Sequence, residues 1–421
     1  MHFFFVCQLI NFVPRLLFAD RWGMKRLVLI TIAFIGTLSV STQCYADVYL
    51  GDNDSFNSAT PEVASVQLMV EKRVDVLLVY CPLYVDDSLF VCYPLRHRFK
   101  AFSENAYPSY LDNWGIMQPY SAKLSDGKME CVDVLFNVGE SELSVSLPTG
   151  EIGSNRIVYV GGNAHGFENI VNGIEGRSFR IHIDGEEIKE DSVLELRECV
   201  NVNVQQETEL VQAYTNTNPW STVTKNWRFT EDSLTISTGM TILRDIHLTN
   251  SLFGMFCVYR HKNGDPLMPY LTSRAVKNND PTVYNVEDGW DSLAENLSLR
   301  TKDHDCTSIT LTGDLDYEFT ISITDAQTLA NGGMNIGTNG LSYNKVYYDL
   351  TGSYQPQIGE ILSAKQIWKI SMPDKEETPT NIVNINKEHE SSPSVYTITG
   401  QRLFAPQRGI NIVGGKKVMN W

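Results

Sequence analysis

The segment Ser178-Phe-Arg-Ile-His-Ile-Asp-Gly-Glu-Glu187 carries the clearest folding signal in this chain of 421 residues. Phe179, Ile181 and Ile183 alternate with polar residues, which is the period of a half-buried β-strand. The Asp-Gly dipeptide that follows favours a two-residue hairpin turn, because both central positions of such a turn need a positive φ. The segment therefore predicts a β-hairpin whose second strand begins near Glu187.

The same alternation recurs along most of the chain. Runs rich in β-branched and aromatic residues predict strands at 74–81, 88–93, 156–160, 178–183, 193–197, 200–204, 226–229, 233–236, 253–259, 308–312, 317–323, 345–348 and 366–370. Helical periodicity is weak, and its best short candidate is 61–72. Many short strands separated by Gly and Asn turns predict an all-β fold of sandwich or jelly-roll type.

Length and turn composition suggest how these strands are divided. The region 47–372 exceeds one ordinary sandwich, and a polar cluster at Asn216-Thr-Asn-Pro219 marks the best boundary. We expect a first β-sandwich over 47–215 and a second over 216–372, followed by a polar linker over 373–393 and a small module over 394–421. A single large two-sheet structure with long loops is the alternative.

The N-terminal region has the three parts of a secretory signal peptide. Lys25-Arg26 precedes an apolar run, and small residues before Asp47 allow cleavage there. The region 1–46 is therefore predicted to be an upstream extension plus signal, with translation starting at Met24. A membrane-anchored form and lipid attachment at Cys44 are the alternatives.

The C-terminal residues form two short strand-turn units. One turns at Gly400-Gln-Arg402, and the other runs through Gly409-Ile-Asn-Ile-Val413 into Gly414-Gly-Lys-Lys-Val418. This pattern resembles the short form of the C-terminal sorting domains read by type IX secretion machinery. The resemblance implies the outer-membrane type IX export machinery as a partner. It also implies an extracellular or outer-membrane surface location in a Gram-negative bacterium.

Charge and cysteine content narrow the partners. The formal net charge is −16, and no Lys/Arg cluster with interleaved aromatics offsets it, so a nucleic acid partner is not expected. An anionic polymer would need a local basic cleft built from residues such as Arg96 and Arg98. No C-x-x-C pair occurs, so the sequence predicts no cysteine metal site, and it leaves any cofactor unknown.

Six cysteines follow the predicted signal peptide, and in an oxidising compartment they could pair in fifteen ways. Cys81, Cys92 and Cys257 lie inside apolar strand-like runs, where a small buried thiol is the alternative. The sequence does not choose between these interpretations.

The sharpest internal motif is Tyr159-Val-Gly-Gly-Asn-Ala-His-Gly-Phe-Glu168. It places Asn163, His165 and Glu168 beside glycines that let the backbone approach a ligand. In polysaccharide elimination an amide or acid neutralises a uronate carboxylate while a histidine removes the α-proton. These three residues are therefore catalytic candidates. The alternative is a turn whose histidine satisfies local backbone groups.

The strand at 178–183 adds a fourth catalytic candidate, His182. His182 and Asp184 lie on its polar face, so beside the Tyr159 strand they could join His165 as a base with an orienting carboxylate or as a metal-capable pair. A solvated face with an incidental ion pair is the alternative. No H-E-x-x-H motif is present, and we expect no metal site.

Aromatic residues in polar surroundings suggest ligand contacts. Trp114 and Trp290 lie beside Asn or Asp, a mixture that suits sugars, because a ring packs on C–H patches while amides and carboxylates bond hydroxyls. Arg260 and His261 are further ligand-binding candidates. Trp227 and Trp368 lie between apolar strand residues and are predicted to be core.

Together these patterns predict a secreted or surface-displayed protein that binds or processes glycan, with a polysaccharide or glycoconjugate as its partner. If it is an enzyme, a polysaccharide lyase or glycoside hydrolase is expected, since the Gly-x-Ser-x-Gly elbow of an α/β-hydrolase is absent. The association of type IX cargo with glycan-degrading enzymes, proteases and adhesins is an analogy. A non-catalytic adhesin or structural surface protein is the alternative.

Overall fold

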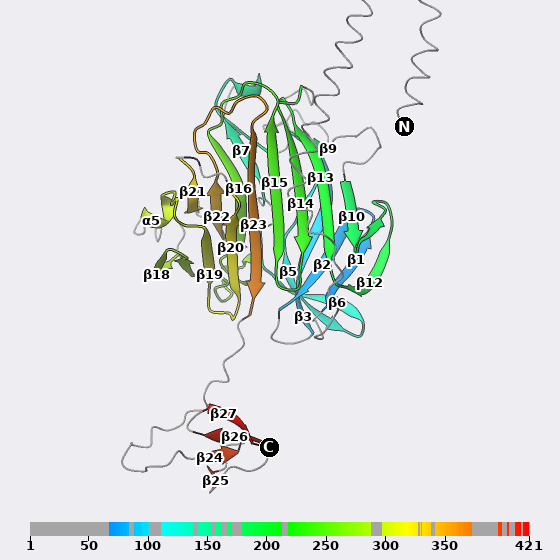
Figure 1. Cartoon of the computed structure of the whole chain (residues 1–421), viewed down its shortest axis with the longest axis vertical. Coiled ribbons are helices and arrows are strands. Elements are labelled where there is room, and N and C mark those ends of the chain that lie inside the picture. Colours follow the sequence, from blue (N-terminus) through cyan, green and yellow to red (C-terminus); the bar gives the residue numbers. More distant parts are fainter. Residues whose placement is uncertain are drawn as a thin grey trace, which may run out of the picture. The chain divides into compact units, whose positions relative to one another are not determined.

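A computed structural model describes most of the central body of the chain. The described residues are 67–83, 88–100, 111–137, 142–153, 157–161, 167–170, 179–212, 218–287, 297–326, 329, 331–337, 342–372 and the strands of the C-terminal module. Within them the structure is almost entirely β, which confirms the predicted all-β fold (Figure 1). No helix of the described part has the length and apolarity needed to cross a membrane.

One group of strands is built from the first part of the body. β12 (Leu194–Cys199), β1 (Leu68–Arg73), β2 (Val76–Pro82) and β3 (Leu89–Lys100) pair antiparallel in that order. The long β3 pairs at its beginning with β5 (Tyr120–Ser125) and at its end with β4 (Leu111–Ile116), and β5 continues to β6 (Lys128–Val134).

A second group forms a long antiparallel series. Its order is β13 (Val202–Leu210), β14 (Ser221–Phe229), β15 (Leu234–Ile242), β23 (Ile361–Ser371), β20 (Glu318–Thr324), β19 (Ser308–Thr312), β17 (Arg274–Lys277) and β18 (Asp280–Asn285). The short β9 (Glu168–Ile170) pairs parallel with β4 and antiparallel with β13, and so joins the two groups. β13 also pairs with β10 (Phe179–Ile183), which forms a hairpin with β11 (Glu186–Ile188).

A separate antiparallel sheet completes the body. It contains β21 (Gly333–Gly337), β22 (Tyr343–Asp349), β16 (Asn250–Tyr259), β7 (Ser144–Leu147) and β8 (Val158–Val160) in that order. Helical structure in the described part is limited to short turns at α5 (Leu297–Arg300), η3 (Glu151–Gly153) and η4 (Lys262–Gly264).

The core lies between these sheets. β13, β14 and β15 each bury every second residue, which is the pattern of strands with one face inward. Phe136 packs edge-on against Phe256, with ring centroids 4.9 Å apart, and stacks on Trp368. Trp227 and Trp368 are fully buried, so their prediction as core residues is confirmed. Cys81, Cys92 and Cys257 are buried free thiols.

The local strand predictions can be compared with the structure directly. The predicted hairpin is present, with Asp184 at φ 53° and Gly185 at φ 82°, as a turn with two positive φ angles requires. The helix expected over 61–72 is wrong at residues 68–72, which belong to β1 and pair with both β2 and β12. The strand period of Leu68 and Val70 outweighs the weak helical pattern, and residues 61–66 lie outside the described range.

Two predictions about organisation concern whole segments. The boundary at residue 216 stays a prediction, and β13 and β14 on its two sides pair along nine residues. In the C-terminal module, β24 (Val395–Thr397) pairs with β25 (Arg402–Leu403) and β26 (Gly409–Val413), which pairs with β27 (Lys416–Asn420). The signal peptide and the linker lie outside the described residues, and the sorting role stays a prediction.

Candidate functional site

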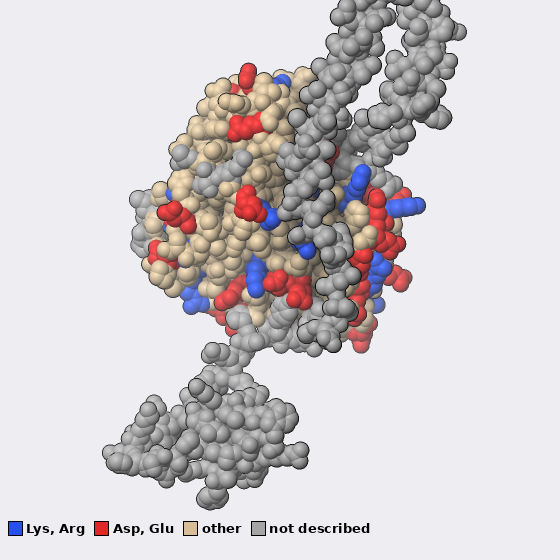
Figure 2. Space-filling model, viewed as in Figure 1, with Lys and Arg blue, Asp and Glu red and all other residues tan. Residues whose placement is uncertain are grey.

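A surface pocket lies where two turns meet the ends of β3 and β4. Its volume is about 340 Å³, and it is lined by Val74, Asp75, His97, Trp114, Glu190 and Asp191. Val74 and Asp75 come from the β1–β2 turn, and Glu190 and Asp191 come from the β11–β12 connection. Figure 2 shows charged side chains gathered on the side of the body where β1, β10 and β12 lie.

Three stacked rings support one wall of this pocket. Trp114 stacks on Phe179 with ring centroids 4.3 Å apart and on His97 with centroids 5.3 Å apart. Strand register explains this, because His97 and Trp114 are direct cross-strand partners of β3 and β4. Trp114 is fully buried, whereas 28% of the His97 side chain is exposed. The stack therefore presents His97, and not Trp114, to solvent.

His97 is also held by hydrogen bonds. Its Nε2 lies 2.8 Å from Oδ1 of Asp112, and its backbone N–H donates to the carbonyl oxygen of Asp75 at 3.0 Å. The hydrogen bond to Asp112 raises the pKa of His97 above its usual value, while partial burial opposes that rise. The imidazole is thereby oriented and biased toward its charged form.

Acceptor groups dominate the rest of the lining. Asp75, Glu190 and Asp191 contribute carboxylates, and Glu190 Oε1 accepts a hydrogen bond from Trp114 Nε1 at 3.1 Å. Carboxylates accept hydrogen bonds from hydroxyl or ammonium groups, and a ring face packs on aliphatic C–H groups. The pocket can therefore hold a hydroxyl-rich ligand by acceptors on one side and an imidazole on the other.

A second polar assembly lies inside the sandwich, around the predicted residue Glu168. Glu168 accepts hydrogen bonds from Asn113 Nδ2 at 2.9 Å and from Thr208 Oγ1 at 2.8 Å. The Lys225 ammonium lies 3.2 Å from Glu168 Oε1 and 3.7 Å from Glu142 Oε2. All five side chains are buried, so this assembly, the interior cluster, is an enclosed ion-paired network.

The sheet register explains how these groups meet. Gln206, Lys225 and Thr238 form a direct cross-strand row on the inward faces of β13, β14 and β15. Glu142 faces this row, and its carboxylate accepts from the backbone N–H of Ile116 at 2.6 Å and from Trp227 Nε1 at 3.1 Å. The row places polar side chains where neighbouring positions hold apolar ones, so ion pairing must offset the loss of hydration.

Electrostatics in the interior cluster follow from these contacts. Burial alone would lower the pKa of Lys225, but the carboxylates of Glu168 and Glu142 together raise it above its ordinary value. Burial raises the pKa of Glu142 against the opposing effects of the Lys225 charge and the Ile116 N–H. Glu142 also has a φ of 75°, an uncommon conformation for a non-glycine residue.

Some polar atoms in this region have no hydrogen bond within the described part of the chain. They include Nη1 of Arg98 and Oδ1 of Asn113, and both atoms are buried. Arg98 is the cross-strand partner of Asn113. Buried unpartnered atoms of this kind are costly, and they distinguish this assembly from the surface pocket.

The predicted catalytic residues are only partly placed. Asn163 and His165 lie outside the described residues. Glu168 is enclosed in the interior cluster and is not part of the pocket lining. His182 is partly exposed on the polar face of β10, as the alternation predicted. The structure therefore positions two of the four, on different surfaces of the sheet.

The predicted ligand-binding residues have varied surroundings. Asp184 accepts hydrogen bonds from the backbone N–H groups of Val200 and Asn201, which makes it a turn residue. Arg260 is buried, with Nε donating to Asn344 Oδ1 at 3.3 Å. The remaining placed candidates are His261, whose ring packs on Tyr270, and Trp114, which lines the pocket. Trp290 lies outside the described residues.

Sequence reasoning missed His97, Asp75, Glu190 and Asp191. His97 lies between Arg96 and Arg98, so the sequence suggests a basic segment and gives no indication of its pairing with Trp114. The other three residues lie in turns, where isolated carboxylates normally face solvent. Only the pairing of strands distant in sequence brings these four side chains together.

Comparisons with known proteins give likeness of structure but not of sequence. No family model matches the chain, and no curated protein is similar to it in sequence. The galactosidase domain of an α-galactosidase–sucrose kinase matches with a TM-score of 0.35 and 10% identity, covering 72% of this chain and 42% of that one. A galactose mutarotase-like protein from Lactobacillus casei matches with a TM-score of 0.32 and 10% identity, covering 72% and 99%.

A third similar structure is the heparan sulfate lyase HepC from Pedobacter heparinus. It matches with a TM-score of 0.30 and 9% identity, covering 90% of this chain and 47% of that one. The chain thus spans less than half the length of the galactosidase and lyase chains that it matches. These proteins are named for sugars or glycans. With TM-scores below 0.5, no residue role of theirs transfers to this chain.

Proposed function

We propose that this protein is a secreted or surface-displayed protein that engages glycans through the pocket at His97. The observation that carries the proposal is the pocket itself, which is lined by a partly exposed imidazole supported by Trp114 and by Asp75, Glu190 and Asp191. A sugar ring matches this arrangement, because its C–H face packs on the imidazole while its hydroxyls donate to the carboxylates.

The negative charge of the pocket determines which classes of glycan it favours. Three carboxylates line the pocket, and Asp112 bonds His97 from behind. A sulfate or uronate would lie close to these negative charges and would be repelled. The pocket therefore favours neutral glycans or those with amino groups.

The test is a glycan array probed with purified protein. Wild-type protein is expected to bind neutral glycans and to ignore sulfated ones. Replacing the partly exposed ring by His97→Ala is expected to weaken binding by roughly tenfold, about 1.4 kcal/mol. The matched control is His247→Ala, because His247 is an exposed histidine that contacts Ser353 and lies outside the pocket. Equal binding by wild type and His97→Ala would remove the pocket from the proposal.

Processing of the bound glycan is the finer form of this proposal. A lyase acts on uronates, which this pocket disfavours, so glycoside hydrolysis is the form of processing that fits the proposed neutral glycans. The predicted residue His165 remains the catalytic candidate, and product release from a glycan panel is expected to disappear in His165→Ala while binding persists. A non-catalytic adhesin is the second candidate, and the enclosure of Glu168 by Asn113, Thr208 and Lys225 favours it. Binding without any released product, in wild type and His165→Ala alike, would identify the adhesin.

The route out of the cell is proposed from the two ends of the chain. The tail that resembles a type IX sorting domain is expected to be required for export. Deleting 394–421 in a host with that machinery should retain the protein inside the cell envelope, where immunoblotting of cell fractions would detect it. Undiminished appearance of the shortened chain in the medium would contradict this role.

A further inference from the structure

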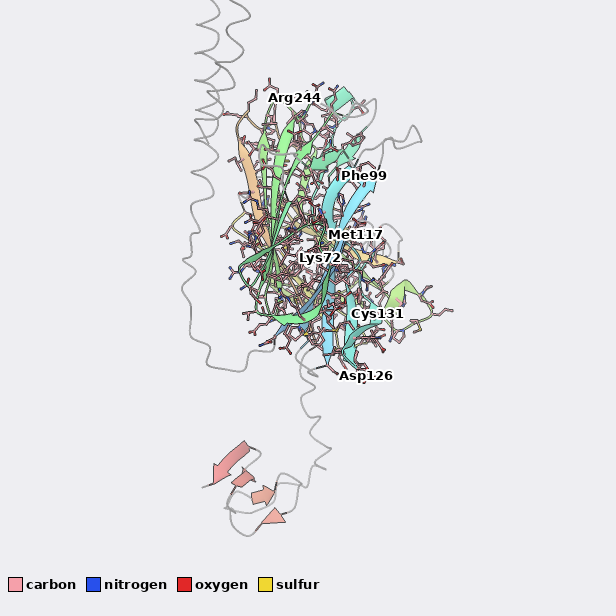
Figure 3. The ribbon with its side chains drawn as sticks, turned by 90° about the vertical axis from the view of Figure 1, so that its right-hand side faces the viewer. Lys72, Phe99, Met117, Asp126, Cys131 and Arg244 are labelled. Atoms are coloured by element: carbon pink, nitrogen blue, oxygen red, sulfur yellow. The ribbon has the colours of Figure 1, made fainter. Side chains whose placement is uncertain are left out.

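Lys72 occupies an inward position that its strand pattern reserves for apolar residues. Leu68, Val70 and Lys72 are the buried residues of β1, while Met69, Glu71 and Arg73 lie on its other face. Lys72 is fully buried, and its position is labelled in Figure 3. A buried lysine needs hydrogen-bond acceptors for its three N–H groups.

The acceptors are backbone carbonyl oxygens of two turns. Lys72 Nζ donates to the carbonyls of Arg73 at 3.1 Å and Val74 at 3.3 Å, at the start of the β1–β2 turn. It also donates to the carbonyls of Ser192 at 2.9 Å and of Glu190 in the β11–β12 connection. The three N–H groups are thus shared among four carbonyl oxygens. One ammonium group therefore connects segments that are more than a hundred residues apart in the chain.

These two turns are the walls of the pocket. Asp75 and Val74 belong to the first turn, and Glu190 and Asp191 belong to the second. Each turn is also tied to the ring stack, the first through the N–H of His97 and the second through Nε1 of Trp114. Lys72 ties the two turns directly to each other.

We propose that Lys72 is a positioning residue that fixes the distance between the two walls of the pocket. The proposal rests on the proposed glycan function only for what the pocket holds, because the connection itself is independent of any ligand. Walls held at a fixed separation keep the carboxylates of Asp75, Glu190 and Asp191 in place before a ligand arrives. A pre-organised site loses less conformational freedom on binding.

The choice of lysine follows from geometry. A compact ammonium can direct three hydrogen bonds into a shell of carbonyl oxygens, whereas the planar guanidinium of arginine needs a flat, forked arrangement. Charge-assisted bonds to carbonyls are also stronger than neutral ones. Methionine would fill the space of the side chain but leave these carbonyls without their donor, so Lys72→Met removes the connection and keeps the volume.

The experiment measures the connection and the ligand separately in the full-length protein. Hydrogen–deuterium exchange of the amides in 73–76 and 189–193 is expected to speed up by roughly tenfold in Lys72→Met, with exchange in β14 and β15 unchanged. Affinity for the neutral glycans bound by wild type is expected to fall by a similar factor. The control is Lys365→Met, which removes a partly exposed lysine paired with Asp325.

The outcomes separate the two proposals. Unchanged exchange in both turns would refute the connection, and faster exchange with full glycan affinity would refute the positioning role. A wild-type protein that binds no glycan would refute the proposed function, and exchange alone would then decide the connection. If Lys72→Met does not fold, Lys72→Gln keeps an N–H donor on a side chain that is one atom shorter, and it is expected to show the same two changes to a smaller degree.

Discussion

Lys72 and Lys225 both have buried ammonium groups, but the groups that contact them differ. Lys72 lies at the end of β1 and donates to backbone carbonyls of two turns. Lys225 lies mid-strand in β14 between the carboxylates of Glu168 and Glu142. Burial lowers the pKa of Lys72 more than the nearby acidic residues raise it. For Lys225 the two contacting carboxylates outweigh burial and raise the pKa.

The difference between the two sites is the charge of the groups that contact each lysine. Carbonyl oxygens are neutral, so they fix the position of an ammonium without compensating its charge. Buried carboxylates compensate the charge, but they become uncompensated charges themselves if the lysine is removed. Lys72 is therefore suited to hold surface turns, and Lys225 is suited to hold the interior together.

The largest effect is expected at Lys225. Lys225→Met removes the cation that contacts both Glu142 and Glu168, and breaking such a buried pair typically costs about 3 to 5 kcal/mol. Chemical denaturation monitored by tryptophan fluorescence measures this loss in the free energy of unfolding. The surface variant Lys365→Met is the control, with an expected cost below about 1 kcal/mol.

A double variant sharpens this prediction. Adding Glu142→Gln to Lys225→Met removes one uncompensated charge and should recover part of the lost stability, which a non-additive cycle would reveal. If Lys225→Met were as stable as the control, the interior cluster would contribute no more than an exposed pair. The comparison between the two lysines would then fail.

A smaller effect is expected at Lys72. Lys72→Met withdraws charge-assisted hydrogen bonds from carbonyls near the surface, where water can replace part of them, so the expected loss is about 1 to 3 kcal/mol. The same denaturation experiment measures it. A loss larger than that of Lys225→Met would reverse the order that the two sets of partners predict.

At alkaline pH, the contributions of the two lysines to stability change in opposite directions. The raised pKa of Lys225 gives a stability contribution that is fully present below pH 10.5 and lost as pH rises through the folded value. The lowered pKa of Lys72 means that the unfolded chain binds more protons just below pH 10.5, so its contribution rises with pH there. The difference in unfolding free energy between wild type and Lys225→Met should therefore shrink above pH 10.5. The difference in unfolding free energy between wild type and Lys72→Met should grow as the pH rises toward 10.5.

Unfolding free energies of the three proteins measured between pH 8 and pH 12 give both differences. Subtracting each variant from wild type cancels the titration of the other lysines and tyrosines. Slopes of the same sign for the two differences would contradict the assignment of carbonyl and carboxylate partners.

The sequence predicts the elements of the fold better than their meeting points. Alternation between Phe179 and Ile183 and the Asp184-Gly185 turn are local signals, so the β10–β11 hairpin could be predicted residue by residue. The same local alternation in β1 would have placed Lys72 inward beside Val70, and it was obscured by a competing helical pattern over 61–72. The strand alternation in β1 therefore predicts that Lys72 faces inward.

The candidate site could not be predicted because it depends on pairing between distant strands. His97 and Trp114 become neighbours only through the β3–β4 register, and Glu190 reaches them only through β12 and β1. Glu168 shows the converse. Its glycine-rich context suggested a ligand site, but the pairing of β9 with both β4 and β13 directs it into the interior cluster.

The smallest effect is expected at the pocket itself. The pKa of His97 is raised by its hydrogen bond to Asp112, with Glu190 and Asp75 adding to the rise. Its stabilising contribution is therefore fully present below about pH 6.5 and lost as pH rises through the folded value. Because the pair is partly exposed, the change should stay below about 1 kcal/mol. Asp112→Asn should reduce this pH dependence between pH 5 and pH 9, measured by thermal unfolding, while His247→Ala leaves it intact. A profile unaltered by Asp112→Asn would show that His97 titrates without its partner and that the imidazole of the pocket is not oriented by Asp112.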